Sequence, residues 1–359
     1  MKTVRDFNVK NKRVLVRCDF NVPLDEQGNI LNDFRIRQTI PTIKYLLKEK
    51  AKIILMSHLG NPEGEMVPEL QMDKIQERLI EILEISEHLD VSITKTPSCK
   101  GYEIEKYIFG LEPSEILLLE NLRFYKEETD NDPEFAKSLS RLGDIYINDA
   151  FGVCHRSHAS VVGVPQYLPC GIGFLIEKEI QNLERLLKNP KKPMIALIGG
   201  KKVGTKSKVI DKILEVADFV LISGLIKEEI EKTGMVFKYP EKLIGPVDSI
   251  ICEGKGLDIG PKTIKLFKKK IRKAKTIFWN GPFGMTEKEE FQKGTFKIAK
   301  AIARKWFCFS VAGGGETIEF LNRKRLISKF DHVSTGGGAM LSFIAGEPLP
   351  GLEALRPKG

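Results

Sequence analysis

The chain has 359 residues, 42% hydrophobic and 29% charged, with a net charge of +9. This length suits two domains or one unusually large one, and the composition excludes a disordered, collagen-like or coiled-coil protein. The charge is uneven: residues 1–175 carry 22 basic and 27 acidic side chains, a net −5, whereas residues 176–359 carry 35 and 21, a net +14. The second half therefore holds the excess of Lys and Arg.

The six cysteines are scattered, without the C-x-x-C spacing of zinc or redox sites, so we expect reduced thiols. The N-terminus lacks the apolar core of a signal peptide, and no apolar run is long enough to cross a bilayer. These features predict a cytoplasmic protein with no membrane partner.

Short runs rich in Val, Ile and Leu alternate with helix-periodic stretches, which is typical of βα units around a parallel sheet. The predicted strands are 13–17, 52–58, 115–121, 144–149, 194–200, 219–224, 275–282, 307–315 and 332–338. The predicted helices include 132–142, 206–217 and 291–305. The pattern predicts an α/β protein built on doubly wound parallel sheets.

A helix-periodic segment at 176–193 joins the two halves, and no flexible Gly/Ser linker is present there. Two domains connected by a helix follow from this pattern. We place them as an N-terminal domain at 1–173, a connecting helix at 174–190, a C-terminal domain at 191–345 and a Pro- and Gly-rich arm at 346–359.

Open parallel sheets bind ligands at the carboxyl ends of their strands. In the second half those positions read GGKKVGTK, WNGPFG, GGGET and STGGG, each before a predicted helix. Glycine lets backbone N–H groups approach an anion, and a helix N-terminus adds partial positive charge. A single turn of this kind is often only a tight connection. Four of them favour a polyphosphate site, with Lys202 and Lys206 beside it.

Two common phosphate motifs are absent. Thr205 follows Gly204 where the P-loop spacing requires a lysine, which disfavours a P-loop NTPase. No G-x-G-x-x-G with an acidic residue further on occurs, which disfavours a dehydrogenase-type dinucleotide fold. The basic run Lys265–Lys275 suits a nucleic acid, but no aromatic stacking motif accompanies it. We therefore interpret that run as a solvated helix face and expect no nucleic-acid partner.

The first half carries a different mixture after its predicted strands. Asp19, Asn21, His58, Arg123 and Asp149 stand there, together with the run FGVCHRSHAS, and Arg35 opens a predicted helix after a turn. Such residues suit a small anionic substrate, although packing, capping and surface ion pairs are structural alternatives for each of them. Ser160 lies near a histidine, but no G-x-S-x-G elbow is present, so nucleophilic catalysis is disfavoured.

Taken together, the sequence resembles the phosphoglycerate kinase family over nearly its whole length. The matching motifs, in chain order, are VRCDFNVP, RIRQTIPTIKYLL, SHLGNP, LLLENLRFYKEE, NDPEFAKSL, NDAFGVCHRSHAS, GFLIEKEI, LIGGKKV, GLDIGPKTI, WNGPFG, AGGGET and HVSTGGGA. The resemblance implies a monomer of two Rossmann-like domains, with the C-terminus returning to the N-terminal domain. It also implies reversible phosphoryl transfer between 1,3-bisphosphoglycerate and Mg-ADP, giving 3-phosphoglycerate and ATP, after hinge bending.

The resemblance further implies a role for individual residues. The implied catalytic residues are Arg35, Lys202, Gly314 and Gly337. The implied substrate-binding residues are Asp19, Asn21, Arg35, His58, Asn61, Arg123 and Arg156. The implied nucleotide-binding residues are Gly200, Lys202, Lys206, Ser223, Gly224, Asn280, Pro282, Glu287, Gly313, Gly314, Gly315, Glu316, Thr317, Ser334, Thr335 and Gly336. Magnesium is implied as part of the Mg-nucleotide, with Glu316 as its protein contact.

Three departures from the family pattern stand out. Asn61 replaces an arginine that binds the substrate phosphate, and Glu316 replaces an aspartate that meets the Mg-nucleotide. The segment Gly224–Gly256, on the adenine side, is shorter than in relatives. Asn61 and the shortened segment keep a second hypothesis open, that of a catalytically weak family member which binds a nucleotide or a partner.

Overall fold

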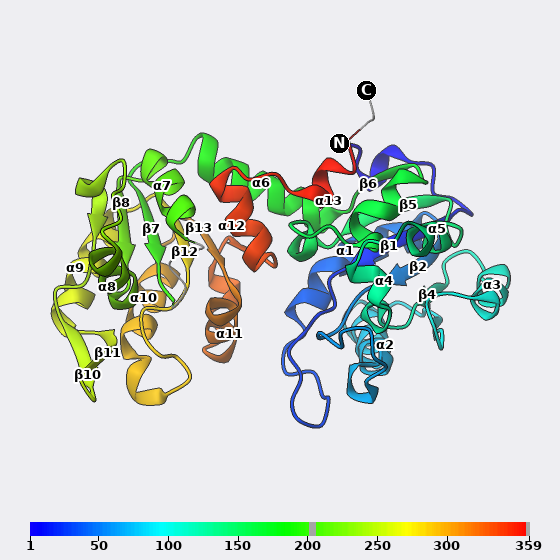
Figure 1. The fold of residues 1–359 in the computed structure, drawn as a ribbon, viewed down its shortest axis with the longest axis horizontal. Helices are drawn as coiled ribbons and strands as arrows, with labels where there is room; N and C mark the ends of the chain where they lie inside the picture. The colour runs from blue at the N-terminus through cyan, green and yellow to red at the C-terminus, as the bar shows by residue number, and fades with distance from the viewer. Residues whose placement is uncertain (201–205, 357–359) are drawn as a thin grey trace. The chain divides into compact units, whose positions relative to one another are not determined.

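The computed structural model describes residues 1–200 and 206–356 (Figure 1). The chain divides into an N-terminal unit, Met1–Glu179 with Pro348–Gly359, and a C-terminal unit, Ile180–Glu347. The helix α6 (Phe174–Lys188) begins in the first unit and ends in the second. No helix in the described part of the chain combines the length and apolar character needed to span a membrane.

The N-terminal unit contains a six-stranded sheet in the order β3-β4-β2-β1-β5-β6, and every neighbouring pair is parallel. Its central strands are buried apolar runs because helices cover both faces of such a sheet. The connection from β1 to β2 runs toward one edge and that from β5 to β6 toward the other, so the switch point lies between β1 and β5. The strands are β1 (Arg13–Cys18), β2 (Lys52–Met56), β3 (Ile93–Lys95), β4 (Ile116–Leu118), β5 (Ile145–Asp149) and β6 (Cys170–Ile172). The helices are α1 (Phe34–Lys48), α2 (Asp73–Glu81), α3 (Tyr102–Phe109), α4 (Lys126–Thr129) and α5 (Pro133–Ser140).

The C-terminal unit repeats this design with the strand order β14-β13-β12-β7-β8-β9. The strands are β7 (Met194–Ile198), β8 (Phe219–Ile222), β9 (Leu243–Ile244), β12 (Thr276–Asn280), β13 (Phe309–Gly313) and β14 (His332–Val333). An antiparallel pair, β10 (Ser249–Cys252) and β11 (Lys255–Ile259), stands apart from the sheet. The helices are α7 (Ser207–Val216), α8 (Gly224–Thr233), α9 (Pro261–Lys273), α10 (Lys293–Ala303), α11 (Gly315–Arg323) and α12 (Gly337–Ala345).

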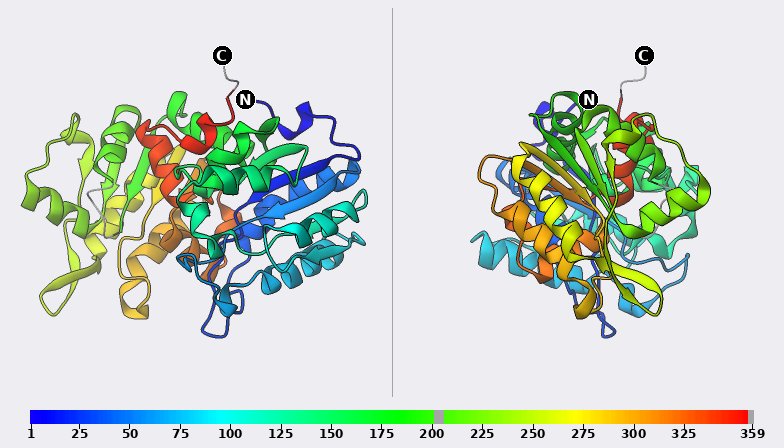
Figure 2. Two further views of the ribbon diagram at one scale, coloured as in Figure 1. Left: turned by 45° about the vertical axis from the view of Figure 1, so that its right-hand side comes forward. Right: turned by 90° about the vertical axis from the view of Figure 1, so that its left-hand side faces the viewer.

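The helices of the C-terminal unit form two layers, one on each face of its sheet (Figure 2). The connections β7–β8 and β12–β13 run in opposite directions, so right-handed crossovers put α7 and α10 on opposite faces. Helix α7 packs against α12, and α9 packs against α10. The switch point therefore lies between β7 and β12, where two opposing connections leave a crevice at the carboxyl ends.

The C-terminal arm contains a short helix, α13 (Pro350–Glu353), and packs on the N-terminal unit. The Gly351 N–H donates a hydrogen bond to the Cys154 carbonyl at 2.9 Å. A Cβ atom at position 351 would lie 2.7 Å from a methyl group of Val161 and 2.9 Å from the Cys154 Cα, so only glycine fits this close approach.

The predicted fold class is confirmed, and all nine predicted strands are present. Several end earlier than predicted; the run 332–338, for example, contributes only His332–Val333, because its glycines belong to a turn and to α12. Five strands in the described part of the chain were not predicted. Strands β3 and β6 have three residues each and no continuous apolar run, β9 has two residues, and the remaining two are the antiparallel pair β10 and β11. The six cysteines are free thiols, as their spacing predicted.

Asp149, the last residue of β5, is completely buried where β5 meets the start of α6. Its Oδ1 accepts a hydrogen bond from the Leu175 N–H at 2.9 Å, whereas Oδ2 has no hydrogen-bond partner among the described residues. Burial raises the pKa of this carboxyl from 3.8 to about 7. Hydrogen bonds from the Thr42 side chain and from the Leu175 and Ile176 N–H groups oppose this rise in pKa without cancelling it.

This pKa makes the stability of the protein depend on pH. The unfolded chain releases the proton near pH 4 and the folded chain near pH 7, so the free energy of unfolding falls by about 1.4 kcal/mol per pH unit across that window. Asp149→Asn keeps the Oδ1 acceptor and removes the titration. We expect urea unfolding, followed by circular dichroism, to show the variant gaining stability relative to the wild type between pH 5 and pH 7.5. An equal difference at both pH values would contradict this assignment.

Candidate active site

Polar side chains gather at the switch point of the N-terminal unit. Asp19, directly after β1, is 1% exposed, and its Oδ1 accepts a hydrogen bond from Arg35 Nη1 at 3.2 Å. The same Nη1 donates to the Asn21 carbonyl at 3.1 Å. The Asn21 side-chain oxygen accepts from the Gly60 N–H at 2.8 Å. These bonds join the loop after β1 to the first turn of α1 and to the loop after β2.

Four arginines face His58, a buried residue in the loop after β2. Burial lowers the pKa of the His58 imidazole well below 6.5, and the positive charges of the arginines lower it further, so the ring is neutral. Burial and the nearby arginines also lower the pKa of Arg123 to about 10. Its Nη1 donates to the Gly60 carbonyl at 2.7 Å. The cluster is strongly electropositive and suits an anion; its arginines are Arg17, Arg35, Arg123 and the exposed Arg156.

Arg17, which the sequence analysis did not select, is fully buried in this cluster. Its Nη2 lies 3.2 Å from His58 Nδ1, and its Nε donates to Ser160 Oγ at 2.8 Å. Glu128 Oε1 lies 3.8 Å from Arg17 Nη2 and accepts a hydrogen bond from Ser160 Oγ at 2.6 Å. The Ser160 hydroxyl thus bridges the buried Arg17 and Glu128 side chains. This structural role agrees with the expectation that Ser160 is not a nucleophile. A charged residue inside an otherwise apolar strand was the available signal for Arg17.

Asn61 is exposed, and its side-chain amide donates to Glu63 Oε1 at 3.2 Å. Of the predicted substrate-binding residues, Asp19, Asn21, Arg35, His58 and Arg123 are joined by the contacts above, and Arg156 adds its charge. Asn61 instead pairs with the Glu63 carboxylate. Position 61 therefore contributes no positive charge to the cluster.

Two glycine-containing loops touch at the switch point of the C-terminal unit. The Gly200 N–H donates to the Pro282 carbonyl at 2.9 Å, and the Gly199 N–H donates to the Asn280 carbonyl at 2.8 Å. A Cβ at Gly199 would lie 2.1 Å from the Pro282 oxygen, and one at Gly281 would lie 2.2 Å from the Gly199 oxygen. The contact therefore excludes any side chain and brings two loops of backbone together.

The starts of α11 and α12 lie against each other beside this contact. A Cβ at Gly337 would lie 3.9 Å from the Gly314 Cα, so the two helix N-termini converge. Asn280 Nδ2 donates to the carbonyl of Gly313 at 3.1 Å, and Thr317 Oγ1 accepts from the Gly281 N–H at 2.8 Å. Two helix N-termini at one place make a suitable site for phosphate groups. The predicted residues Gly313, Gly314, Gly315, Ser334, Thr335 and Gly336 all belong to these two turns.

Lys206 is mostly buried immediately before α7, and its Nζ donates to the Gly199 carbonyl. Burial lowers the pKa of this amine, and the Glu316 carboxylate acts in the opposite direction. The ammonium is therefore held at the glycine contact. Lys202, predicted beside it, lies outside the described residues.

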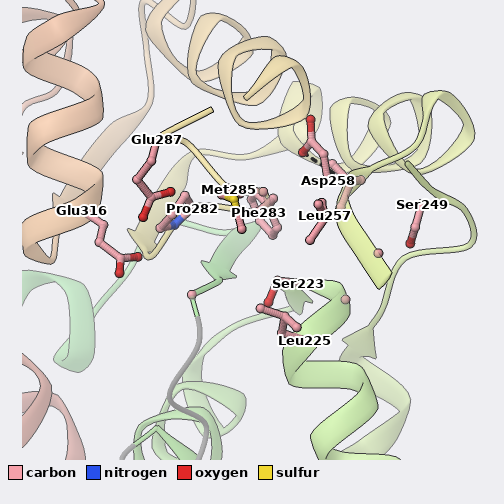
Figure 3. Close-up of a pocket in the computed structure, with 15 residues that line it drawn as sticks. Ser223, Leu225, Ser249, Leu257, Asp258, Pro282, Phe283, Met285, Glu287 and Glu316 are labelled. Carbon is pink, nitrogen blue, oxygen red and sulfur yellow. Dashed lines mark hydrogen bonds between the residues drawn. The ribbon is translucent and has the colours of Figure 1, made fainter. Parts of the chain in front are cut away.

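A narrow pocket opens next to the glycine contact (Figure 3). The enclosed space within it is small, about 50 Å³. Figure 3 shows Glu287 and Glu316 at one end and Ser249 and Leu257 at the other. The pocket contains six predicted nucleotide-binding residues, Gly200, Ser223, Gly224, Pro282, Glu287 and Glu316.

The sequence pattern did not indicate the apolar part of this pocket or its buried carboxyl group, Asp258. Leu225, Leu257, Phe283 and Met285 line the pocket together with Asp258. Asp258 Oδ2 accepts from the Gly294 N–H at 2.7 Å, and burial raises the pKa of its carboxyl to about 6. Only the GLDIGPKTI motif pointed toward Asp258.

Within the described residues, no group of three or more His, Cys, Asp or Glu side chains could hold a metal ion. Glu316 is a single exposed carboxylate in the first turn of α11. Mg²⁺ is commonly bound by one or two carboxylates together with substrate phosphates. The donor set therefore fits a magnesium ion that arrives with a nucleotide, and it does not fit a metal held by the protein alone.

Comparison with known proteins shows the family of the chain. The family model described as "Phosphoglycerate kinase" matches residues 4–236 and 229–347. The chain belongs to the phosphoglycerate kinase family. A phosphoglycerate kinase from Dictyoglomus turgidum is 42% identical over 396 aligned positions that cover 99% of this chain and 98% of the relative. One from Aquifex aeolicus is 40% identical over 399 positions, with the same coverage of both chains.

Solved structures of the family agree with the fold. Phosphoglycerate kinase from Pyrococcus horikoshii has a TM-score of 0.84 at 34% identity, and that from Coxiella burnetii has 0.80 at 31%. Each comparison covers 99% of this chain and 98% of the other. The predicted phosphoglycerate kinase membership is confirmed, and with it a phosphotransferase activity that uses a carboxyl group as acceptor.

The convergence of α11 and α12 predicts a sharp effect of a methyl group at Gly314. Gly314 has φ 94°, and a Cβ there would lie 2.8 Å from Asn280 Nδ2. Gly101, before the first residue of α3 as Gly314 is before that of α11, has a similar extended backbone with positive φ, at 106°, and nothing within 4 Å, so Gly101→Ala introduces comparable backbone strain without this contact. We expect Gly314→Ala to raise the Kd for Mg-ATP about tenfold or more, and Gly101→Ala to leave it within about twofold, in titration calorimetry. Equal effects would contradict a phosphate site at this turn.

Proposed function

We propose that the chain transfers the γ-phosphoryl group of Mg-ATP to the carboxylate of 3-phosphoglycerate and catalyses the reverse transfer from 1,3-bisphosphoglycerate to Mg-ADP in glycolysis. The carrying observation is that a single chain of this family holds both an arginine cluster around neutral His58 and converging helix N-termini in the other unit. The first arrangement suits a small phosphorylated acid and the second a polyphosphate.

In this proposal the arginine cluster binds the substrate and does not take part in covalent chemistry. Arg123 and Arg156 neutralise its phosphate, and His58, uncharged at neutral pH, contributes one ring nitrogen as a hydrogen-bond partner. Arg35 is fixed on one side by Asp19 and the Asn21 carbonyl, and its side chain remains 28% exposed. It is therefore free to direct its remaining N–H groups toward the moving phosphoryl group.

The nucleotide is assigned to the C-terminal unit. Its phosphates would lie at the N-termini of α11 and α12 beside Lys206, with the purine against Leu225, Leu257 and Met285 of the neighbouring pocket. Mg²⁺ would be held by the nucleotide phosphates and by Glu316. The ion neutralises charge that develops on the phosphate oxygens.

The transfer itself requires no protein nucleophile. A carboxylate oxygen forms a bond to the γ-phosphorus as the bond from phosphorus to the bridging oxygen breaks, and that electron pair stays on ADP. Arg35 and Lys202 would neutralise the charge on the transferred group. Because the two sets of residues belong to different units, we assign the necessary approach to bending at the two joining segments, α6 and the chain near residue 347.

We also propose that the segment between Gly224 and Gly256 is shorter than in relatives. The alignment with the Dictyoglomus turgidum protein spans 396 positions, although this chain has 359 residues. The family model matches in two parts that overlap at residues 229–236. The adenine side would then depend on the start of α8 and on the β10–β11 pair, whose residues Leu225, Ser249 and Leu257 line the pocket.

A coupled assay with purified protein, 3-phosphoglycerate and Mg-ATP tests the activity. We expect Arg35→Ala to lower kcat by about a hundredfold or more, because it removes a donor to the transferred group. Arg37, on the same helix, pairs with Asp33 at 2.9 Å, so Arg37→Ala is the matched control and should retain activity within about threefold. Wild-type turnover no higher than that of Lys202→Ala would overturn the proposed enzyme and leave the catalytically weak binding protein.

Asn61 provides a separate test of substrate binding. Its pairing with Glu63 is the observation that favours weak binding of substrate. Asn61→Arg adds a cation beside the arginine cluster, so we expect the KM for 3-phosphoglycerate to fall about tenfold while the KM for ATP is unchanged. An unchanged KM for 3-phosphoglycerate would show that the missing arginine is compensated elsewhere.

A further inference from the structure

Two adjacent aromatic side chains stand in solvent on the C-terminal unit. Trp306 and Phe307, in the turn between α10 and β13, are 92% and 97% exposed. Large exposed apolar side chains placed side by side are unusual, because burying such rings stabilises a folded protein. Neither ring contributes to the core of the unit, so packing does not account for the pair.

The pair lies at the opposite ends of the sheet's strands from the nucleotide pocket. Trp306 and Phe307 precede β13 and therefore stand at the amino ends of the parallel strands, whereas the glycine contact and the pocket lie at the carboxyl ends. The phosphotransferase reaction does not require these rings.

A basic groove runs from the aromatic pair along α9 and α10. The groove encloses about 1160 Å³, and both helices line it. Neither helix contains an Asp or Glu, and in the described part of the chain none of the groove's basic side chains forms a salt bridge with a carboxylate. Lys305 Nζ donates to the Arg272 carbonyl at 2.8 Å, which ties the ends of α9 and α10 together beside the rings. The basic side chains from the two helices are Lys265, Lys268, Lys269, Arg272, Lys297 and Lys300.

A second hollow of about 540 Å³ shares Arg304, Lys305 and Trp306 with the groove and is lined in addition by Lys329. The basic track therefore continues past Trp306. A concave track of this kind fits a flexible polyanion that follows it. A lipid bilayer presents a flat surface, which would meet the rings but leave the lysines inside the hollows out of reach.

We propose that this track binds single-stranded nucleic acid, with phosphates along the lysines and arginines and with bases stacked on Trp306 and Phe307. Positive grooves that follow the backbone, combined with aromatic rings on which bases stack, are the usual means of binding single strands without sequence preference. Along the chain, the basic run Lys265–Lys275 predicts only a solvated helix face, because no aromatic stacking motif accompanies it. In the fold, Trp306 and Phe307, which follow α10, line the same groove as this run.

Fluorescence anisotropy with labelled oligouridylate and oligodeoxythymidylate of about 12 nucleotides tests the proposal. We expect binding to the full chain at about 50 mM salt, a steep loss at about 200 mM salt, and no competition from saturating Mg-ATP. Trp306→Ala with Phe307→Ala should weaken binding about tenfold or more. Phe109→Ala removes another ring, 93% exposed, from the N-terminal unit and should have no effect.

Charge is tested by a second pair of variants. Lys268→Glu with Lys300→Glu should weaken binding about tenfold or more and reduce its salt dependence. Lys10→Glu with Lys12→Glu changes the net charge equally, outside the track, and should retain most of the binding. Coupled-assay activity of every variant should match the wild type, which controls for folding. Absence of binding at low salt, equal loss in the control variants, or binding only to vesicles that contain phosphatidylserine would each overturn the proposal.

Discussion

The contact between the loops after β7 and β12 is the constraint on which the proposed nucleotide site depends. Gly199 and Gly281 approach so closely that a Cβ on either would lie within 2.2 Å of a carbonyl oxygen. Backbone therefore fills the switch point, and the carbonyl of Gly199 fixes the Lys206 ammonium. The neighbouring bond from the Gly281 N–H to Thr317 holds the first turn of α11 beside the same contact. The proposed phosphate site is thus built mainly from backbone, where the helix N-termini carry only partial positive charge, and Lys206 adds one full charge beside it.

The N-terminal unit solves the opposite problem, because its site consists of charged side chains. Several arginines near one another repel, and a buried charge without a partner costs several kcal/mol. Glu128 supplies one negative charge to Arg17, and Ser160 joins the two by hydrogen bonds. His58 remains neutral, which avoids a further positive charge. After these pairings the cluster keeps a net positive charge, which suits the binding of an anion.

The contrast explains what the sequence could and could not predict. The glycine-rich turns after β7, β12 and β13 were visible because the pattern is local, with a strand, glycines and a helix start within a few residues. Arg17 and Glu128 belong to β1 and α4, and their pairing depends on how the chain folds between them. The same holds for the apolar wall of the nucleotide pocket, which combines α8, β11 and the loop after β12. Lys202 stays a prediction, because it lies outside the described residues.

The uneven charge of the chain is only partly explained by the reaction. Helix C-termini at the amino edge of the sheet carry about half a negative charge each, and basic residues in their last turns offset it. The C-termini of α9 and α10 together carry about one negative charge. Helix α9 alone, PKTIKLFKKKIRK, has seven Lys and Arg residues. The excess lies away from the nucleotide pocket, next to two rings that packing does not require. Neither helix dipoles nor phosphoryl transfer accounts for that combination, so a second polyanion at the amino edge is the simpler explanation of the charge.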